Sequence, residues 1–333
     1  MQIVKYKAED GSEFLQRMRS RSLQDDPDLI RQVSAIIEGV RSGGDEALVH
    51  YTKQFDGIDI GPIGIRVDLS ELSSLAARAS RGRVDAFLKA AGNVRRFHEH
   101  ERETGWMIRP EEGRETGIRV LPVASAGLYV PGGKAAYPSS IVMNVVPAQV
   151  AGVPRIAVTT PPGTIEKTPE IAAVLTELGI TEVYRVGGAQ AVAALAFGTE
   201  TIPRVDKITG PGNAYVAIAK KLVFGSVGID SVAGPTEIVV LADDSANPAF
   251  VAADLLAQAE HDEQASSICI TPSEEFASSV AVEVERQLAS LDRRAIAAAS
   301  IENYGVIFVV SSLEAGCELV NQIAPEHLEL MTR

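Results

Sequence analysis

The chain has 333 residues, of which 46% are hydrophobic and 23% are charged, so it can bury a large core and form two domains. Its formal net charge of −13 argues against nucleic acid or an anionic membrane surface as a partner and favours a small-molecule substrate. Because the sequence has no apolar run of roughly 18 residues and residues 1–10 lack a signal-peptide pattern, we expect a cytoplasmic protein.

The first third of the chain is predicted to be helical. Asp26 and Pro27 have the pattern of an N-cap and a first helical residue, and apolar residues then recur at helical spacing as far as Gly43-Gly44. Further helices are expected over residues 45–54 and 70–102, the latter with a break near Ser80.

From Ile118 onward, short apolar strands alternate with helices, which is typical of α/β domains with parallel sheets. Strands are predicted over residues 155–160, 182–186, 207–209, 237–242, 267–271 and 306–310. Helices are predicted over residues 140–151, 169–178, 189–197, 213–223, 248–261, 274–291 and 313–322. The expected fold class is therefore α/β, with two Rossmann-like domains, mainly parallel sheets and a helical N-terminal region.

Two joints are rich in glycine, and the second of them follows the strand predicted over residues 182–186. In the first, residues 127–134, glycines would let backbone N–H groups approach a phosphate or nicotinamide, and Tyr129 could stack on a flat ring. In the second, residues 186–191, an anion could meet a helix N-terminus while Gln190 bonds an amide or a ribose. A tight turn with no ligand is the alternative for either joint.

Two more joints offer polar side chains. Asn213, in the joint over residues 209–215, is in an N-cap position, so capping alone could explain it. This joint fails the standard dinucleotide fingerprint, because Tyr215 stands where the third glycine belongs. In the joint over residues 233–237, Thr236 could offer a hydroxyl group to a ligand.

Metal and acid–base candidates are few. Gln258 and His261 are three residues apart on one predicted helix, so their side chains could share a face. Two ligands of one metal ion must do so. The alternative is an ordinary polar helix end. Glu326 and His327 follow Pro325, which suits the first turn of a helix. The two side chains would then diverge, and the helix dipole would favour neutral imidazole; a solvated turn is the alternative.

The two cysteines, Cys269 and Cys317, lie in apolar patterns and are expected to be inert core residues. We assign neither of them a nucleophilic role.

Taken together, six ordered stretches closely resemble the histidinol dehydrogenase family, which has an aldehyde dehydrogenase-like fold. The resemblance covers nearly the whole chain. Its most specific stretches are residues 127–134, 186–199, 210–215, 233–237, 257–267 and 324–330.

The resemblance implies an NAD-dependent, zinc-assisted oxidation of L-histidinol to L-histidine through L-histidinaldehyde, the last step of histidine biosynthesis, by a homodimer. It also implies an N-terminal arm over residues 1–20 and a first α/β domain over residues 21–128 plus 238–333. An inserted NAD-binding domain is expected over residues 129–237.

Family roles carry over residue by residue. The positions that match NAD contacts are Tyr129, Gln190 and Asn213. The positions that match substrate contacts are Thr236, Gln258, His261 and His327, of which Gln258 and His261 also match zinc ligands. Glu326 and His327 match the catalytic pair, His327 taking the hydroxyl proton and Glu326 activating water, while zinc orients the substrate.

The sequence departs from the family at its end. The family continues past the position of Arg333 with a segment that supplies an aspartate and a histidine to zinc and a glutamate to the substrate. We therefore expect weak zinc binding and impaired activity and hypothesise a truncated chain, which an intact mass of residues 1–333 from the native source would contradict. A paralogous amino- or hydroxy-alcohol dehydrogenase and a noncatalytic nucleotide-binding scaffold remain alternatives.

Overall fold

The computed structural model describes residues 1–6, 14–16, 18, 26–132, 138–232 and 234–333. The chain divides into two compact units, which we call the split unit (residues 1–23 and 234–333) and the continuous unit (residues 24–233). The predicted α/β fold class, with mainly parallel sheets and a helical front region, is confirmed. The division differs from the predicted one, because residues 24–128 pack with the middle of the chain instead of with its last hundred residues.

The continuous unit is built on a five-stranded parallel sheet with the strand order β6-β5-β4-β7-β8. Its strands are β4 (Ser125–Tyr129), β5 (Arg155–Thr159), β6 (Glu182–Tyr184), β7 (Lys207–Thr209) and β8 (Gly228–Ile229). Its later helices are α5 (Pro138–Val150), α6 (Thr164–Lys167), α7 (Pro169–Glu177), α8 (Gly188–Phe197) and α9 (Ala214–Val223). The strand order reverses between β4 and β7, so the joints after these strands flank a topological switch point, the usual ligand position in open α/β sheets.

The front helices belong to this unit because they pack on the helices that connect the strands of its sheet. These helices are α2 (Pro27–Asp56), α3 (Leu69–Ala76) and α4 (Arg81–His100), which pack on α8, α7 and α5 respectively. As predicted, Asp26 caps α2, its side chain accepting from the backbone N–H groups of residues 28 and 29. The predicted boundary at Gly43-Gly44 is a kink inside α2 (Gly44 φ 52°), beyond which the Asp45 N–H donates a 2.8 Å bond to Glu200.

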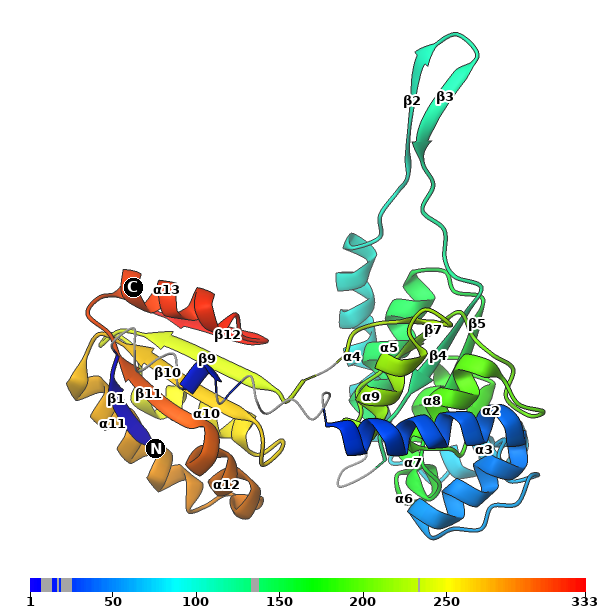
Figure 1. Cartoon of the computed structure of the whole chain (residues 1–333), viewed down its shortest axis with the longest axis horizontal. Coiled ribbons are helices and arrows are strands. Elements are labelled where there is room, and N and C mark those ends of the chain that lie inside the picture. The colour runs from blue at the N-terminus through cyan, green and yellow to red at the C-terminus, as the bar shows by residue number, and fades with distance from the viewer. Residues whose placement is uncertain (7–13, 17, 19–25, 133–137, 233) are drawn as a thin grey trace. The chain divides into compact units, whose positions relative to one another are not determined.

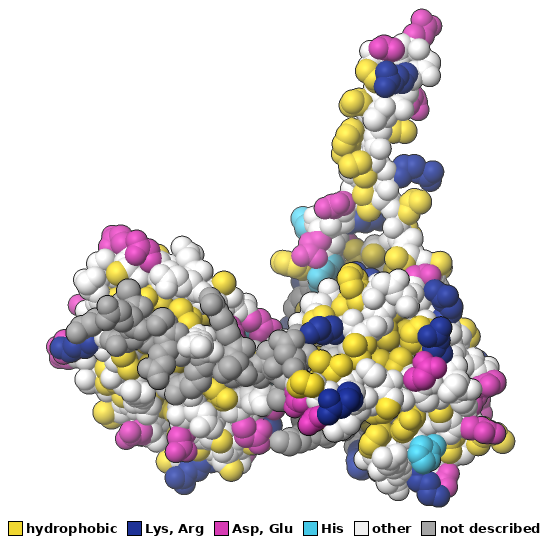
Figure 2. All heavy atoms as spheres, viewed as in Figure 1, with side chains coloured by type: hydrophobic (Ala, Val, Ile, Leu, Met, Phe, Trp, Pro, Cys, Tyr) yellow, Lys and Arg dark blue, Asp and Glu magenta, His cyan; other side chains and the backbone are white. Residues whose placement is uncertain are grey.

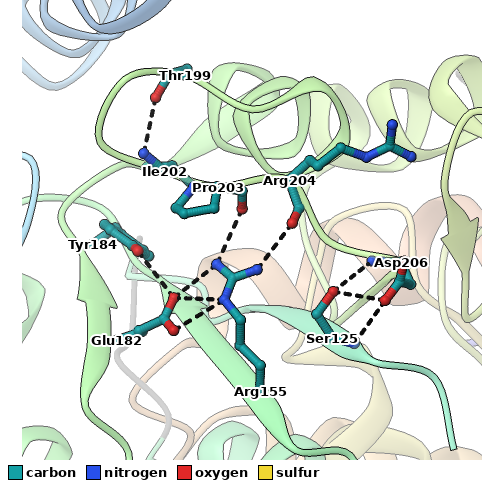
Figure 3. Close-up of polar contacts among 9 residues, drawn as sticks. All are labelled: Ser125, Arg155, Glu182, Tyr184, Thr199, Ile202, Pro203, Arg204 and Asp206. Carbon is teal, nitrogen blue, oxygen red and sulfur yellow. Dashed lines mark hydrogen bonds and ion pairs between the residues drawn. The ribbon is translucent and has the colours of Figure 1, made fainter.

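A partly buried polar network fixes the edge of the sheet. Arg155 on β5 pairs with Glu182 on β6 at 2.8 Å, and its guanidinium also donates to the carbonyl groups of Pro203 and Arg204 (Figure 3). Burial opposes the charge of Glu182, but the hydrogen bonds from Arg155 lower the pKa of that carboxyl group. The network holds the segment after α8 against the sheet.

The continuous unit also carries a hairpin that the sequence analysis did not predict. Strands β2 (Trp106–Glu111) and β3 (Arg114–Ile118) pair antiparallel, with Gly113 at φ 77° in the turn. The hairpin extends away from the body of the unit (Figure 1), and all its residues are exposed.

The split unit contains a second five-stranded parallel sheet, with the strand order β1-β11-β10-β9-β12. Its strands are β1 (Gln2–Lys5), β9 (Glu237–Ala242), β10 (Ser266–Thr271), β11 (Gly305–Val309) and β12 (His327–Met331). Its helices are α10 (Pro248–Ala259), α11 (Glu274–Leu288), α12 (Arg294–Tyr304) and α13 (Leu313–Ile323). Apolar clusters lie on both faces of this sheet, which explains the nearly continuous apolar character of its central strands.

Candidate functional site

A pocket of about 560 Å³ lies in the continuous unit, where the joints after four strands meet. Its lining comes from the segments after β4, β5, β6 and β7 and from the end of α2, and includes Tyr129, Gly132, Pro161, Gln190 and Asn213. The three residues that match the family's NAD contacts are therefore brought together in one pocket. Gly133 and Lys134 of the first joint lie outside the described residues.

Tyr129 connects two of these joints. Its phenol oxygen accepts a 3.1 Å hydrogen bond from the backbone N–H of Gly188, and the side chain is 4% exposed. Burial raises the pKa of Tyr129, so the phenol stays neutral. The residue thus helps to shape the pocket in addition to lining it.

Gln190 has an unsatisfied polar atom. It is the third residue of α8 and is 1% exposed, yet its Oε1 is buried with no hydrogen-bond partner. A buried carbonyl oxygen without a donor costs about 1–3 kcal/mol, so such an atom in a pocket wall marks a place where a ligand donor would bind.

Asn213 is an N-cap, as its position predicted, and its Oδ1 accepts from the backbone N–H of Val216 at 3.2 Å. The capping interpretation and the ligand interpretation are compatible, because the capping bond uses the amide oxygen and leaves the amide NH₂ group for the pocket.

The joint before Asn213 is held by a buried ion pair. The Nζ of Lys220 donates to the carbonyl of Gly210 at 3.0 Å and pairs with Asp230, which accepts from the Gly210 N–H at 2.9 Å. Gly210 itself has φ +122°, and a Cβ there would lie 2.2 Å from the carbonyl oxygen of Tyr129. Only glycine allows this loop to approach the end of β4 so closely.

The split unit holds the other predicted residues at the N-terminal edge of its sheet. Thr236, just before β9, donates a 2.7 Å hydrogen bond from its hydroxyl group to Oε2 of Glu326. The same hydroxyl accepts from Nε2 of Gln258, a buried residue near the end of α10. Three residues from distant parts of the chain therefore form one hydrogen-bonded group.

His327 lies beside this group. Its Nδ1 is 3.1 Å from the backbone carbonyl of Glu237 and 3.8 Å from Oε2 of Glu326. Because a carbonyl can only accept, the contact assigns the proton to Nδ1 in the neutral ring and leaves the lone pair on Nε2. That tautomer is suited to accepting a proton from a substrate.

The predicted helical turn after Pro325 is wrong. Helix α13 ends with Ala324 in the left-handed region (φ 51°), and the chain enters strand β12 at His327. The strand pairs parallel with β9, so that His327 lies opposite Ile238. The reason is that the edge of β9 accepts this segment as a partner, and the alternation of Leu328 and Leu330 with polar residues, a period of two, fits a strand. The imidazole tautomer is therefore set by a carbonyl contact and not by a helix dipole.

His261 lies beyond the helix that was predicted to carry it. Helix α10 ends at Ala259, and His261 follows in a turn in which its N–H donates to the Gln258 carbonyl at 3.2 Å. His261 is exposed and Gln258 is 8% exposed, so the two side chains have different environments. Among the described residues no three His, Cys, Asp or Glu side chains gather to hold a metal. Two donors alone do not complete a zinc shell.

The structure adds residues that the sequence analysis missed. Asp56 and Lys167 line the pocket of the continuous unit, and burial raises the pKa of Asp56. In the split unit, Glu329 lies near Asp254 of α10, and both burial and that neighbouring carboxylate raise the pKa of Glu329. These contacts arise from packing between elements that are distant in the sequence. The only sequence signal for any of them is the alternation around Glu329, which indicates a strand.

The cysteines differ from each other. Cys269 is a core residue, as predicted, and burial raises the pKa of its thiol to about 12. Cys317 is exposed on α13, against the prediction that it is a core residue, because the apolar face of that helix is formed by other positions.

Comparison with known proteins shows to which family this chain belongs. The family model for histidinol dehydrogenase matches residues 19–333. The chain belongs to the histidinol dehydrogenase family. As a member, it is an oxidoreductase of histidine biosynthesis.

Relatives agree along nearly the whole chain. Histidinol dehydrogenase of Halalkalibacterium halodurans is 53% identical over 300 residues, which are 90% of this chain and 70% of that protein. The enzyme of a Synechococcus species is 49% identical over 333 residues, 99% of this chain and 76% of its own. The crystal structure of the Elizabethkingia anophelis histidinol dehydrogenase is 37% identical and superposes with a TM-score of 0.90. The match covers 99% of this chain and 75% of that one.

Among the helices of the described residues, none combines the length and the apolar character that crossing a bilayer requires.

Proposed function

We propose that this histidinol dehydrogenase family member oxidises L-histidinol to L-histidine through L-histidinaldehyde and transfers one hydride to each of two NAD molecules in succession. The observation that carries the proposal is the hydrogen-bonded group of Thr236, Gln258 and Glu326 with His327 beside it, which offers an oriented carboxylate and an oriented imidazole.

In the first oxidation, His327 is proposed to act as the base. Nδ1 is held by the Glu237 carbonyl, so Nε2 accepts the proton of the substrate hydroxyl group as hydride leaves the carbinol carbon. The alcohol loses two electrons and two hydrogens, and the product is the aldehyde.

In the second oxidation, Glu326 is proposed to activate water. Its carboxylate is oriented by Thr236 and takes a proton from water as the water oxygen bonds to the aldehyde carbon. The resulting hydrate anion loses a second hydride to NAD and one further proton to give the carboxylate. The buried and inert thiol of Cys269 agrees with a route that needs no covalent thioester.

NAD is proposed to bind in the pocket of the continuous unit, where it supplies the hydride acceptor. The pocket fits such a ligand because Gln190 in its wall has a buried acceptor without a donor. Tyr129 and Asn213 complete the proposed contacts.

Zinc, homodimer formation and a cytoplasmic location are proposed from the family resemblance. Gln258 and His261 would contribute an amide oxygen and an imidazole nitrogen to the metal, which would orient the substrate. Since the described residues offer an incomplete shell, none of the steps above passes through the metal.

The proposal is tested by counting NADH formed per L-histidinol by the 333-residue chain, with added zinc and with a chelator. Two equivalents are expected, and the absence of NADH under both conditions would contradict the proposal.

Variants separate the two oxidations. We expect Glu326→Gln to form one equivalent of NADH and to accumulate aldehyde, detectable with a carbonyl-trapping reagent, whereas His327→Asn loses both steps. Glu318→Gln, which removes an exposed carboxylate on α13, is the matched control and should form two equivalents. A Glu326→Gln enzyme that still forms two equivalents at the normal rate would exclude the proposed role of Glu326.

A further inference from the structure

Two charged side chains in the pocket of the continuous unit are not used by the proposed contacts. Asp56, the last residue of α2, and Lys167, the last residue of α6, both line the pocket. Within the described part of the chain, neither side chain makes a hydrogen bond or an ion pair. The pocket therefore contains a carboxylate and an ammonium group that are each available to a ligand.

Asp56 is in a position that disfavours a carboxylate. The C-terminal end of a helix carries partial negative charge, and α2 ends at Asp56 with Gly57 as its cap. Burial also raises the pKa of Asp56. Burial and the negative charge of Asp56 both raise the pKa of the Tyr129 phenol, so the carboxylate lies within electrostatic reach of Tyr129. Since no cation of the described chain offsets these costs, the carboxylate is suited to accept hydrogen bonds from a ligand.

The segment that follows α2 lies against the joint after β5. Cδ1 of Ile58 is 3.7 Å from the point at which a Cβ of Gly163 would lie. Pro161 and Pro162 of the same joint line the pocket together with Asp56. The carboxylate therefore lies near the carboxyl end of β5, although it comes from the front of the chain.

A carboxylate near this joint has a specific use in dinucleotide-binding folds. There, an Asp or Glu about 20 residues beyond the glycine-rich turn accepts a hydrogen bond from the 2′-hydroxyl group of a ribose. In this chain the first Asp or Glu after Gly132 is Glu166, whose side chain is held by Arg185 at 2.9 Å. The regular ribose acceptor is therefore missing from its usual place, and Asp56 offers the same group from α2.

The same carboxylate would repel a phosphate group on that ribose. The 2′-phosphate of NADP carries about −1.5 to −2 charges at pH 7, and a carboxylate within hydrogen-bonding distance opposes it. Lys167 does not distinguish the two cofactors, because both contain a pyrophosphate that an ammonium group can bind. Figure 2 shows Lys and Arg interspersed with Asp and Glu over the drawn face of this unit, so no broad field of one sign on that face decides the choice.

We propose that Asp56 accepts hydrogen bonds from the hydroxyl groups of the adenosine ribose and makes the pocket select NAD over NADP. The inference rests on the proposed NAD site and deepens it by naming the residue that sets the cofactor specificity. Asp56 is a binding residue, and neither of the two oxidation steps passes through it.

Calorimetric titration with ADP-ribose and with its 2′-phosphate derivative tests this role, since both ligands lack nicotinamide and no turnover is needed. We expect the 333-residue chain to bind ADP-ribose at least about 30-fold more tightly than the 2′-phosphate, and Asp56→Asn to lower this ratio by about ten-fold or more. Because the helix dipole disfavours a carboxylate at this end of α2, the variant should keep its fold. The matched control is Asp59→Asn, which removes a carboxylate that pairs with Lys53 outside the pocket lining and should change the ratio by less than about two-fold.

A ligand without the 2′-hydroxyl group distinguishes a direct contact from a long-range effect of charge. Loss of this hydroxyl group from ADP-ribose should weaken binding by about ten-fold in the wild type but by less than about three-fold in Asp56→Ala, because both changes remove the same hydrogen bond. Equal losses in the two proteins would overturn the contact.

The outcomes separate the proposals. A wild type that binds neither NAD nor ADP-ribose would overturn both the NAD site and the role of Asp56. If ADP-ribose binds and Asp56→Asn keeps the wild-type ratio, the specificity role alone is overturned. Tighter binding of the 2′-phosphate by the wild type would also overturn it and would assign the choice to Lys167. The NADH stoichiometry measures the oxidation independently of these affinities.

Discussion

The backbone N–H of Gly188 donates a 3.1 Å hydrogen bond to the phenol oxygen of Tyr129. The bond joins the end of β4 to the start of α8, although β5 and β6 separate these positions along the sequence. Two of the glycine-rich joints thereby become one wall of the pocket.

Replacing Tyr129 by phenylalanine should weaken NAD binding. The variant removes the bond that holds the Gly188 joint against the end of β4, so the free pocket is less ordered, and we expect the dissociation constant to rise by about five-fold, which corresponds to about 1 kcal/mol. Calorimetric titration with NAD measures the change. Tyr51→Phe, which lies outside the pocket lining, is the control, and an unchanged affinity in Tyr129→Phe would show that this bond does not shape the site.

Replacing Lys220 by alanine should destabilise the continuous unit. Lys220 is 3% exposed, and its removal leaves Asp230 without its cation and the Gly210 carbonyl without its donor. We expect a loss of about 2–4 kcal/mol in the free energy of unfolding, measured by urea denaturation. Lys207→Ala, at an exposed position of β7, should lose less than about 0.5 kcal/mol.

Replacing Thr236 by valine should lower kcat with little change in KM. The substitution keeps the shape of the side chain but removes the hydroxyl group that connects Gln258 with Glu326. We expect a loss of about ten-fold or more in kcat, since oriented acid–base groups contribute about 10²–10⁴-fold. Thr236→Ser restores the hydroxyl group and should return most of the rate. If valine and serine variants were equally active, Thr236 would have no part in orienting Glu326.

Replacing Glu329 by glutamine should stabilise the split unit more at pH 8 than at pH 4. Burial, with Asp254 nearby, raises the pKa of this carboxyl group in the folded state. A raised pKa means that the folded state binds more protons, so the stability that protonated Glu329 contributes is lost as the pH rises through the folded pKa. Melting temperatures at both pH values measure the difference. Glu285→Gln, an exposed position on α11, should give no such pH-dependent gain.

Much of the fold follows from local sequence signals. The strand predicted over residues 237–242 is observed with the same bounds, because Pro235 and Asp243 interrupt the apolar run on either side. Asp26 and Asn213 cap the helices for which their side chains are suited. These features depend on a few neighbouring residues, and the sequence contains all the information they need.

Other features depend on distant parts of the chain. The hairpin escaped prediction because Pro110 and several charged residues interrupt its alternation, and no buried face reveals it. Pro325 restricts its own φ, but whether the next residues form a helix or a strand is decided by the edge of β9, which accepts β12 as a partner. The contact of Asp56 with the pocket likewise arises only when α2 packs on α8 and α9.

The pairing of β1 with β11 has a consequence for the folding of the chain during translation. Ile3 lies opposite Ile307, so about 300 residues must be added before the first strand meets its neighbour. At about 5–20 residues per second, this takes about 15–60 s of translation. The continuous unit contains no residue beyond 233, so it can fold on the ribosome while β1 is still unpaired. Chaperones that hold unpaired strands should therefore bind the nascent chain at its N-terminus.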